Sequence, residues 1–132
     1  MDAKAWKEGG CHCKRVRFKV ALAARIEVED CNCSICLMSQ NAHIIVPASN
    51  FELIKGEKDL ITYTFNTGVA QHLFCRYCGV KSFYIPRSNP DGRAVTWRCL
   101  DNPNDFESVQ VNQFDGVHWE ANAAVLSHKS KN

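Results

Sequence analysis

Apolar and polar residues alternate along much of this chain, and alternation with a period of two is the pattern of a half-buried β-strand. Val16, Phe18 and Val20 alternate with cations, so this segment has one apolar and one charged face. Comparable alternation or short β-rich runs occur at residues 26–28, 43–46, 51–54, 61–65, 73–75, 82–85, 94–99 and 108–111. Turn-forming Gly, Pro, Asn and Asp residues separate these runs. The sequence therefore predicts a mainly β domain.

One segment near the C-terminus has a helical period instead. Trp119, Asn122, Ala123 and Leu126 are spaced at i, i+3, i+4 and i+7, so they would share one face of a helix. We therefore expect a short C-terminal helix. The chain has 132 residues and no linker, repeat or low-complexity tract, which indicates a single domain over residues 1–132.

Eight cysteines interrupt this pattern, and seven of them fall into three clusters. The clusters are Cys11-His12-Cys13, Cys31-Asn32-Cys33-Ser34-Ile35-Cys36 and Cys75-Arg76-Tyr77-Cys78. In an extended segment residues i and i+2 point to the same side, so each Cys-x-Cys directs two sulfurs at one point. Cys-x-x-Cys does the same across a tight turn, and Gly79 suits the bend that follows the second cysteine. This spacing is typical of metal ligands.

The number of cysteines in each cluster predicts how the ligands divide. A structural zinc site has four protein ligands, whereas a catalytic site usually has three and one open position. The two pairs together supply four sulfurs, and the triplet joined to either pair would supply too many for tetrahedral zinc. We therefore expect two zinc sites, one closed and one open. The closed site would contain Cys11, Cys13, Cys75 and Cys78, and the open site Cys31, Cys33 and Cys36.

The composition gives a reason for such metal sites. Apolar residues make up 45% of the chain when the eight cysteines are counted, and about 39% without them, which is below typical globular usage. Binding a metal converts ligand-binding free energy into folding free energy. Zinc would therefore supplement a modest hydrophobic core.

Three alternatives remain open from the sequence alone. The clustered cysteines could form disulfides, although metal ligation is commoner inside cells. The eighth cysteine, Cys99, is either a buried free thiol or a fourth ligand that closes the triplet site. His43 and His72 lie on β-like segments near the clusters, where they either contact a substrate or serve as ordinary core or surface histidines.

Charge and hydropathy narrow the partners and the location. The formal net charge of +2 falls to −1 if seven thiolates bind two Zn²⁺, so the overall charge gives no support for nucleic-acid binding. A patch of four cations, Lys14, Arg15, Arg17 and Lys19, would be the route to such binding, but it is more simply a solvated face. No apolar run is long enough to span a membrane, and residues 1–10 contain no export signal. We expect a soluble intracellular protein in the cytoplasm, with the nucleus as the alternative.

The cysteine clusters and their neighbours resemble the glutathione-dependent formaldehyde-activating enzyme family over residues 9–119. The resemblance rests on Gly9-Gly10-Cys11-His12-Cys13 followed by Val16 and Phe18, on the triplet segment, and on Phe74-Cys75 with Cys78-Gly79. Within the family, segments such as Thr62-Tyr63-Thr64-Phe65-Asn66-Thr67 and Pro86-Arg87-Ser88-Asn89-Pro90 are most similar to the domain of centromere protein V. One departure is Lys14, which stands where the family usually has glycine.

This resemblance implies a fold and a division of labour between the sites. It implies a mainly β, Mss4-like fold in which several small antiparallel sheets surround a structural zinc site. It also implies that Cys11, Cys13, Cys75 and Cys78 are structural ligands and that Cys31, Cys33 and Cys36 are active-site ligands. This agrees with the division obtained above by counting ligands.

The function implied is that of a carbon–sulfur lyase-type enzyme, which joins glutathione to formaldehyde as S-hydroxymethylglutathione or reverses that step. Zinc held by three thiolates could bind the glutathione sulfur and keep it as thiolate, the attacking species. Arg87, Arg93 or Arg98 could hold a carboxylate of glutathione. The alternative from another class is a non-catalytic zinc module that binds a protein partner, which a fourth ligand from Cys99 would favour.

Overall fold

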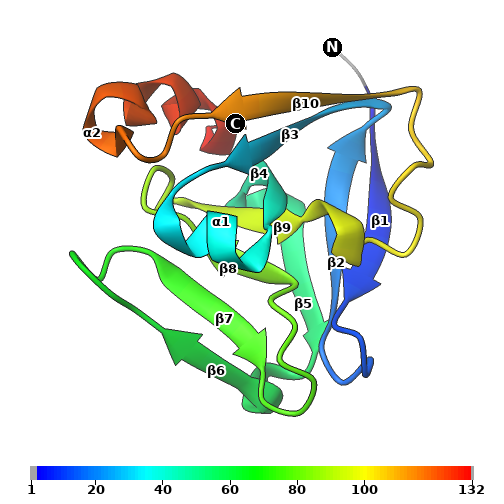
Figure 1. Ribbon diagram of the computed structural model, residues 1–132. Coiled ribbons are helices and arrows are strands. Elements are labelled where there is room, and N and C mark those ends of the chain that lie inside the picture. The colour runs from blue at the N-terminus through cyan, green and yellow to red at the C-terminus, as the bar shows by residue number, and fades with distance from the viewer. Residues whose placement is uncertain (1–2, 132) are drawn as a thin grey trace.

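Two β-sheets form the fold of the computed structural model, which describes residues 3–131 (Figure 1). The first sheet has three antiparallel strands in the order β1 (Lys4–Gly10), β2 (Arg17–Ala23) and β5 (Phe51–Lys55). The second has seven strands in the order β10 (Ser108–Phe114), β3 (Arg25–Cys31), β4 (Ala42–Pro47), β9 (Gly92–Thr96), β8 (Phe83–Ile85), β7 (Gln71–Cys75) and β6 (Leu60–Tyr63). All neighbours in it are antiparallel except β10 and β3, which run parallel.

Short helices connect and cover these sheets. α1 (Ser34–Ser39) follows β3, and α2 (Trp119–Asn122) follows β10 and continues in 3-10 turns over Ala123–Ser130. Figure 1 shows α2 and the C-terminal segment beside the end of β10. Further 3-10 turns span Ala48–Asn50, Glu57–Asp59 and Trp97–Cys99. Within residues 3–131 no helix combines the length and the apolar character needed to cross a membrane.

The mainly β fold and the short C-terminal helix predicted from the sequence are confirmed. A strand overlaps each predicted segment, although the 94–99 segment leaves the sheet at Trp97 to form a 3-10 turn. The prediction of several small antiparallel sheets did not include two features of the structure: one sheet has seven strands, and it contains a parallel pair. A parallel pair needs a long crossover, and most of the domain lies between β3 and β10 in the sequence.

Two elements were not predicted. β1 lacks regular alternation and ends in two glycines, and a side chain at Gly10 would collide with the carbonyl oxygen of Val16. α1 has only six residues, too few to show a helical period, so the apolar pattern does not predict it.

The main core lies between the two sheets. The rings of Phe18, Phe51 and Phe83 pack with centroids 4.7 to 6.1 Å apart, and Phe18 is fully buried. Cys11 and Cys75 belong to the same buried cluster. The alternating segment around Phe18 therefore turns its apolar face toward the larger sheet, as the sequence pattern predicts.

The opposite face of the seven-stranded sheet carries a second, smaller cluster. Strand register places His72 opposite Tyr84, Tyr84 opposite Ala94, and Ala94 opposite Ile45, so these four residues form a row across four strands. Leu126 from the C-terminal turns packs against this row. Because both faces of the sheet are covered, every residue of β4 is buried, which explains its continuous apolar run.

Candidate metal centres and the adjoining cleft

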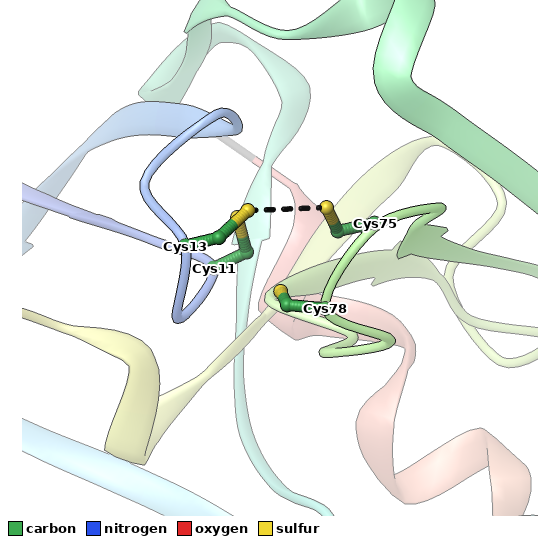
Figure 2. Close-up of side chains that lie close together, drawn as sticks. All are labelled: Cys11, Cys13, Cys75 and Cys78. Atoms are coloured by element: carbon green, nitrogen blue, oxygen red, sulfur yellow. Dashed lines mark hydrogen bonds between the residues drawn. The ribbon is translucent and has the colours of Figure 1, made fainter.

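Four cysteines from two distant turns come together beside the main core (Figure 2). Cys11 and Cys13 lie in the turn that joins β1 to β2, where the Lys14 amide donates to the Cys11 carbonyl oxygen at 3.2 Å. Cys75 ends β7, and the Gly79 amide donates to its carbonyl oxygen at 2.8 Å, which closes the turn that carries Cys78. The first Cys-x-Cys thus lies on a turn, so the prediction of an extended segment was wrong. His12, between the two cysteines, is exposed.

The sulfurs of this four-cysteine cluster have the spacing of a tetrahedral metal site. All four Sγ atoms lie within 4.8 Å of one another, and Cys13 Sγ is 3.6 Å from both Cys11 Sγ and Cys75 Sγ. Sulfurs at the corners of a tetrahedron with zinc–sulfur bonds of about 2.3 Å would be about 3.8 Å apart. The cluster could therefore hold one metal ion with all four coordination positions filled by cysteine sulfurs.

Nearby donors stabilise thiolates in this cluster. The Val16 amide donates to Cys11 Sγ at 3.3 Å, and the Tyr77 amide donates to Cys75 Sγ at 3.4 Å. Hydrogen bonds from the backbone and side chain of Arg15 lower the pKa of Cys13 to about 6. The Arg15 guanidinium also lies over the Tyr77 ring, 4.2 Å from its centroid, which holds the cation beside the cluster.

The remaining clustered cysteines form a separate triplet. Cys31 ends β3, Cys33 is the N-cap of α1, and Cys36 lies inside that helix, so the strand-to-helix junction brings the three Sγ atoms within 4.8 Å of one another. The Cys33 amide donates to Cys31 Sγ at 3.4 Å. Hydrogen bonds from the Cys31 and Cys36 thiols, with smaller contributions from the Cys36 and Ile35 amides, lower the pKa of Cys33. The structure thus separates the sulfurs into the predicted groups of four and three.

Gly116 packs closely against the triplet. A Cβ atom at this position would lie 2.5 Å from Cys31 Sγ and 2.7 Å from the Cβ of Cys33. Glycine therefore allows the loop after β10 to cover the triplet, a role that the cysteine pattern gives no means of predicting.

Cys99 does not join the triplet. It lies in the Trp97–Cys99 turn, and its sulfur is not among those that gather with Cys31, Cys33 and Cys36 in residues 3–131. Burial, with smaller contributions from the charges of Cys11 and Cys78, raises the pKa of Cys99 to about 11, which places the residue nearer the four-cysteine cluster. All eight cysteines lie in the described part of the chain, and none forms a disulfide. The first observation favours a free thiol at Cys99 over a fourth ligand of the triplet. The second favours metal ligation over disulfides for the clustered cysteines.

The triplet opens on a cleft of about 480 Å³, within the size range of small-molecule sites. Besides the three cysteines, its polar lining includes His43, His72, Tyr84, Arg87 and Glu120. Apolar surface comes mainly from Phe65, Phe114, Val117 and Trp119. Both histidines that the sequence left undecided therefore line the cleft, and each is buried.

Hydrogen bonds fix His43 in one orientation at the base of the cleft. Thr96 donates to the Lys81 carbonyl oxygen at 2.7 Å, and Asn41 Nδ2 donates to Thr96 Oγ1 at 2.9 Å. This leaves Asn41 Oδ1 to accept from His43 Nδ1, which is 3.0 Å away. The Tyr84 hydroxyl lies 3.2 Å from both ring nitrogens, and with the proton on Nδ1 it donates to Nε2.

Tyr84 connects His43 to the triplet. Its hydroxyl oxygen lies 3.9 Å from Cys36 Sγ. Burial lowers the pKa of His43 to about 3, with the nearby charge of Lys81 adding to the effect, so the ring is neutral at pH 7. The tyrosine hydroxyl is thus held between a neutral imidazole and a triplet sulfur. The sequence pattern does not identify Tyr84 as a site residue, whereas the strand register does.

One of the three arginines considered from the sequence lies at the cleft. Arg87 Nη2 is 2.7 Å from Glu120 Oε1, and its guanidinium lies 3.8 Å from the centroid of the Trp119 ring. Arg93 instead donates to the Gly92 carbonyl oxygen, and Arg98 lies over the Trp97 ring. Neither of these two is among the residues that line the cleft in the described part of the chain.

Most of the cationic patch considered for nucleic-acid binding is paired within the domain. Arg17 donates to Asp101 Oδ1 at 2.9 Å and lies near Glu8, while Lys19 Nζ is 3.4 Å from Glu52 Oε2. Arg15 is held at the four-cysteine cluster, as described above.

The donor chemistry of both clusters fits a thiophilic metal. Both consist of cysteine sulfurs with backbone amide donors that favour thiolate, and sets of three or four cysteines are the usual ligands of zinc. The two clusters could therefore hold metal ions.

Comparison with known proteins agrees with this arrangement. A crystal structure of a Rhodobacter sphaeroides protein is similar, with a TM-score of 0.67 and 32% sequence identity, over 80% of this chain and 99% of that one. The likeness to centromere protein V stays a prediction. A family model described as glutathione-dependent formaldehyde-activating enzyme matches residues 6–115, which include all seven clustered cysteines. The chain therefore belongs to the glutathione-dependent formaldehyde-activating enzyme family.

Proposed function

We propose that this protein is a zinc-dependent carbon–sulfur lyase-type enzyme that forms S-hydroxymethylglutathione from glutathione and formaldehyde, or reverses that reaction. The observation that carries the proposal is the placement of the three-cysteine cluster at the wall of a cleft of about 480 Å³. The family is that of a glutathione-dependent enzyme acting on formaldehyde, which suggests the substrates. A cluster of four sulfurs elsewhere has no position for a substrate, so we assign it a structural role.

The two clusters would then divide the work. Cys11, Cys13, Cys75 and Cys78 would hold a structural zinc, and Cys31, Cys33 and Cys36 would hold the zinc of the active site. A zinc ion bound by three thiolates supplies a fourth position in which a substrate sulfur is kept as thiolate at neutral pH. Since three anionic ligands already reduce its Lewis acidity, we favour activation of the thiol over polarisation of the carbonyl group.

Residues of the cleft would orient glutathione. Its carboxylates need a cationic partner, and Arg87 is the lining arginine that can offer a fork of donors. Glu120 beside it could accept from the α-ammonium group of the γ-glutamyl residue. Phe65, Phe114 and Trp119 supply apolar walls that limit water around the reacting sulfur.

A cobalt-substituted protein would test thiol binding. Co²⁺ should give sulfur-to-metal and d–d absorption bands, and glutathione should change them by entering the triplet site. S-methylglutathione is the matched control, because it has no ionisable thiol and should have much less effect. An unchanged spectrum with glutathione would contradict the proposal at its first step.

Catalysis needs a separate measurement. The rate of S-hydroxymethylglutathione formation should exceed the spontaneous rate, and Cys33→Ser should return it to that background. A protein that binds glutathione without raising the rate would be a glutathione-responsive binding protein. That outcome would support the alternative of a non-catalytic zinc module.

A further inference from the structure

One polar atom beside the cleft has no partner. His72 lies in β7, is 4% exposed and lines the cleft. Its ring is nearly parallel to those of Tyr84 and Phe65, with centroids 5.2 and 5.5 Å away. Within residues 3–131, Nε2 of His72 is buried and makes no hydrogen bond. Burying a polar atom without a hydrogen-bond partner destabilises the folded protein. Because this atom belongs to a residue that lines the cleft, an atom of a bound ligand could be its partner.

Lys81 determines which hydrogen bond this atom can make. Lys81 Nζ lies 3.1 Å from His72 Nδ1 and 4.4 Å from the centroid of the Tyr84 ring. An ammonium group has donors and no acceptor, so Nδ1 accepts and the proton of the neutral ring is on Nε2. Burial, assisted by the charge of Lys81, lowers the pKa of His72 to about 4, which keeps the ring neutral at pH 7. The unpartnered atom is therefore an N–H donor.

Tyr84 lies between His72 and the cysteine triplet. The Tyr84 ring stacks on His72, and the Tyr84 hydroxyl is 3.9 Å from Cys36 Sγ. The other cleft histidine differs, because both nitrogens of His43 have partners in Asn41 and Tyr84. Of the two, only His72 has a ring nitrogen without a partner in the described structure.

We propose that His72 donates a hydrogen bond from Nε2 to the oxygen of the one-carbon group of the substrate, and that Lys81 is the positioning residue that keeps the proton on Nε2. This inference rests on the proposed function and adds to it the residue that contacts the carbonyl or hydroxymethyl oxygen. As the sulfur electron pair forms the S–C bond, the C=O π pair moves to oxygen. That oxygen takes the Nε2 proton while Nδ1 takes one from the Lys81 ammonium. The proton that the glutathione thiol lost on becoming thiolate balances this transfer: after the product leaves, it returns through solvent to Nε2 as Nδ1 gives its proton back to Lys81. The reverse reaction runs the same transfers backwards.

Nitrogen-15 NMR of the zinc-loaded protein tests the tautomer and the contact. The wild-type spectrum should show His72 protonated on Nε2, and Lys81→Met should shift the tautomer toward Nδ1–H. Adding glutathione together with formaldehyde should move the Nε2–H resonance, because the adduct brings the acceptor oxygen. Glutathione alone and formaldehyde alone are the controls and should move it much less.

Binding to variants gives an independent measurement. His72→Phe keeps a ring of similar size and removes the donor, so it should weaken binding of the adduct about tenfold, the effect of one good hydrogen bond. Its affinity for glutathione alone should stay within about twofold. His72→Gln retains an N–H donor and should recover part of the loss, while the exposed His118→Gln is the matched control. Melting temperatures of all variants identify any loss of folding.

The outcomes separate this inference from the proposed function. If the cobalt spectrum of the wild type ignores glutathione, the proposed function fails, and the role of His72 fails with it. If that spectrum responds but the His72 resonance does not move and His72→Phe binds the adduct like the wild type, the inference alone is overturned.

Discussion

The Sγ atoms of Cys13 and Cys75 lie 3.6 Å apart, although these cysteines are 62 positions apart in the sequence. One belongs to the turn between the first two strands of the small sheet, and the other ends β7 of the large sheet. The four-cysteine cluster therefore ties the two sheets together and closes a long loop of chain. A metal bound here would stabilise the fold chiefly by gathering segments that lose much conformational freedom on folding.

The two cysteine clusters should contribute unequally to stability. Cys75→Ser removes a fully buried ligand that connects the sheets, so this variant should unfold or melt far below the wild type. Cys33→Ser changes a local strand-to-helix junction and should leave the domain folded while abolishing glutathione binding. Thermal unfolding followed by circular dichroism checks both. Equal losses of melting temperature in the two variants would reject this division of labour.

Metal removal should change the reactivity of the cysteines. We expect about two zinc ions per chain by elemental analysis, with the seven clustered thiols protected from alkylation until a chelator is added. Cys99 is outside both clusters and should react independently of the chelator, slowly because burial raises its pKa to about 11. Mass spectrometry of alkylated peptides gives the result. One zinc at full occupancy, or disulfides in the native protein, would contradict it.

Lys14 is a site where a substitution should stabilise the protein. Its φ is 68°, in the left-handed region, which costs an L-residue about 1–2 kcal/mol and glycine very little. The greater flexibility of glycine in the unfolded chain offsets part of this gain, so Lys14→Gly should raise the free energy of unfolding by about 0.5–1 kcal/mol. Lys14→Ala removes the same charge but keeps the strain, and it is the control. Equal stability of the Gly and Ala variants would show that backbone strain is not the cause.

The sequence predicted the metal ligands better than it predicted their surroundings. Cysteine spacing is local information, and counting four sulfurs per closed site was enough to separate Cys75 from Cys31. The row that joins His72 to Tyr84 depends on strand register, which alternation within one strand does not determine. β1 and α1 were missed for a similar reason, since packing against the rest of the fold determines segments with weak local patterns.

Individual side chains of the cleft show the same limit. Gly116 matters because it lies against Cys31, 85 positions earlier in the chain, and no motif connects the two. Of the arginines considered for the substrate, only the fold selects Arg87, because α2 places Glu120 and Trp119 beside it. Long-range contacts of this kind are visible only once the strands are assembled.

An ion pair near the C-terminus should give a specific pH dependence of stability. Lys129 Nζ lies 3.1 Å from Glu27 Oε2 and 2.9 Å from Glu29 Oε1, and Glu29 is buried. Hydrogen bonds from Lys129 and Asn112 lower the pKa of Glu27 in the folded state. Its contribution to stability is thus complete above the ordinary carboxylate pKa and is lost as the pH falls toward the lowered value.

Lys129→Met should therefore destabilise the protein most at neutral pH, by leaving buried Glu29 without its cation. The difference in unfolding free energy between wild type and variant should shrink as the pH falls below about 4.5, near the ordinary pKa of glutamate. Both proteins contain the same cysteines, so loss of metal in acid should largely cancel in the difference. A difference that stays constant from pH 7 to pH 4 would exclude this ion pair as the cause.

Arg87 should determine which thiols the cleft prefers. Its guanidinium lines the cleft, lies 3.8 Å from the centroid of the Trp119 ring, and is 2.7 Å from Glu120, so it is held in place before any substrate arrives. Arg87→Gln should weaken glutathione binding about tenfold, because a charge-assisted contact to a carboxylate is lost. 2-Mercaptoethanol has a thiol but no carboxylate, so its affinity should not change. Arg93→Gln is the matched control, since that arginine bonds to the Gly92 carbonyl oxygen and should affect neither thiol. Titrations of the cobalt-substituted wild type and both variants with each thiol measure these affinities. An equal loss for both thiols in Arg87→Gln would mean that this arginine supports the cleft structurally and does not select glutathione.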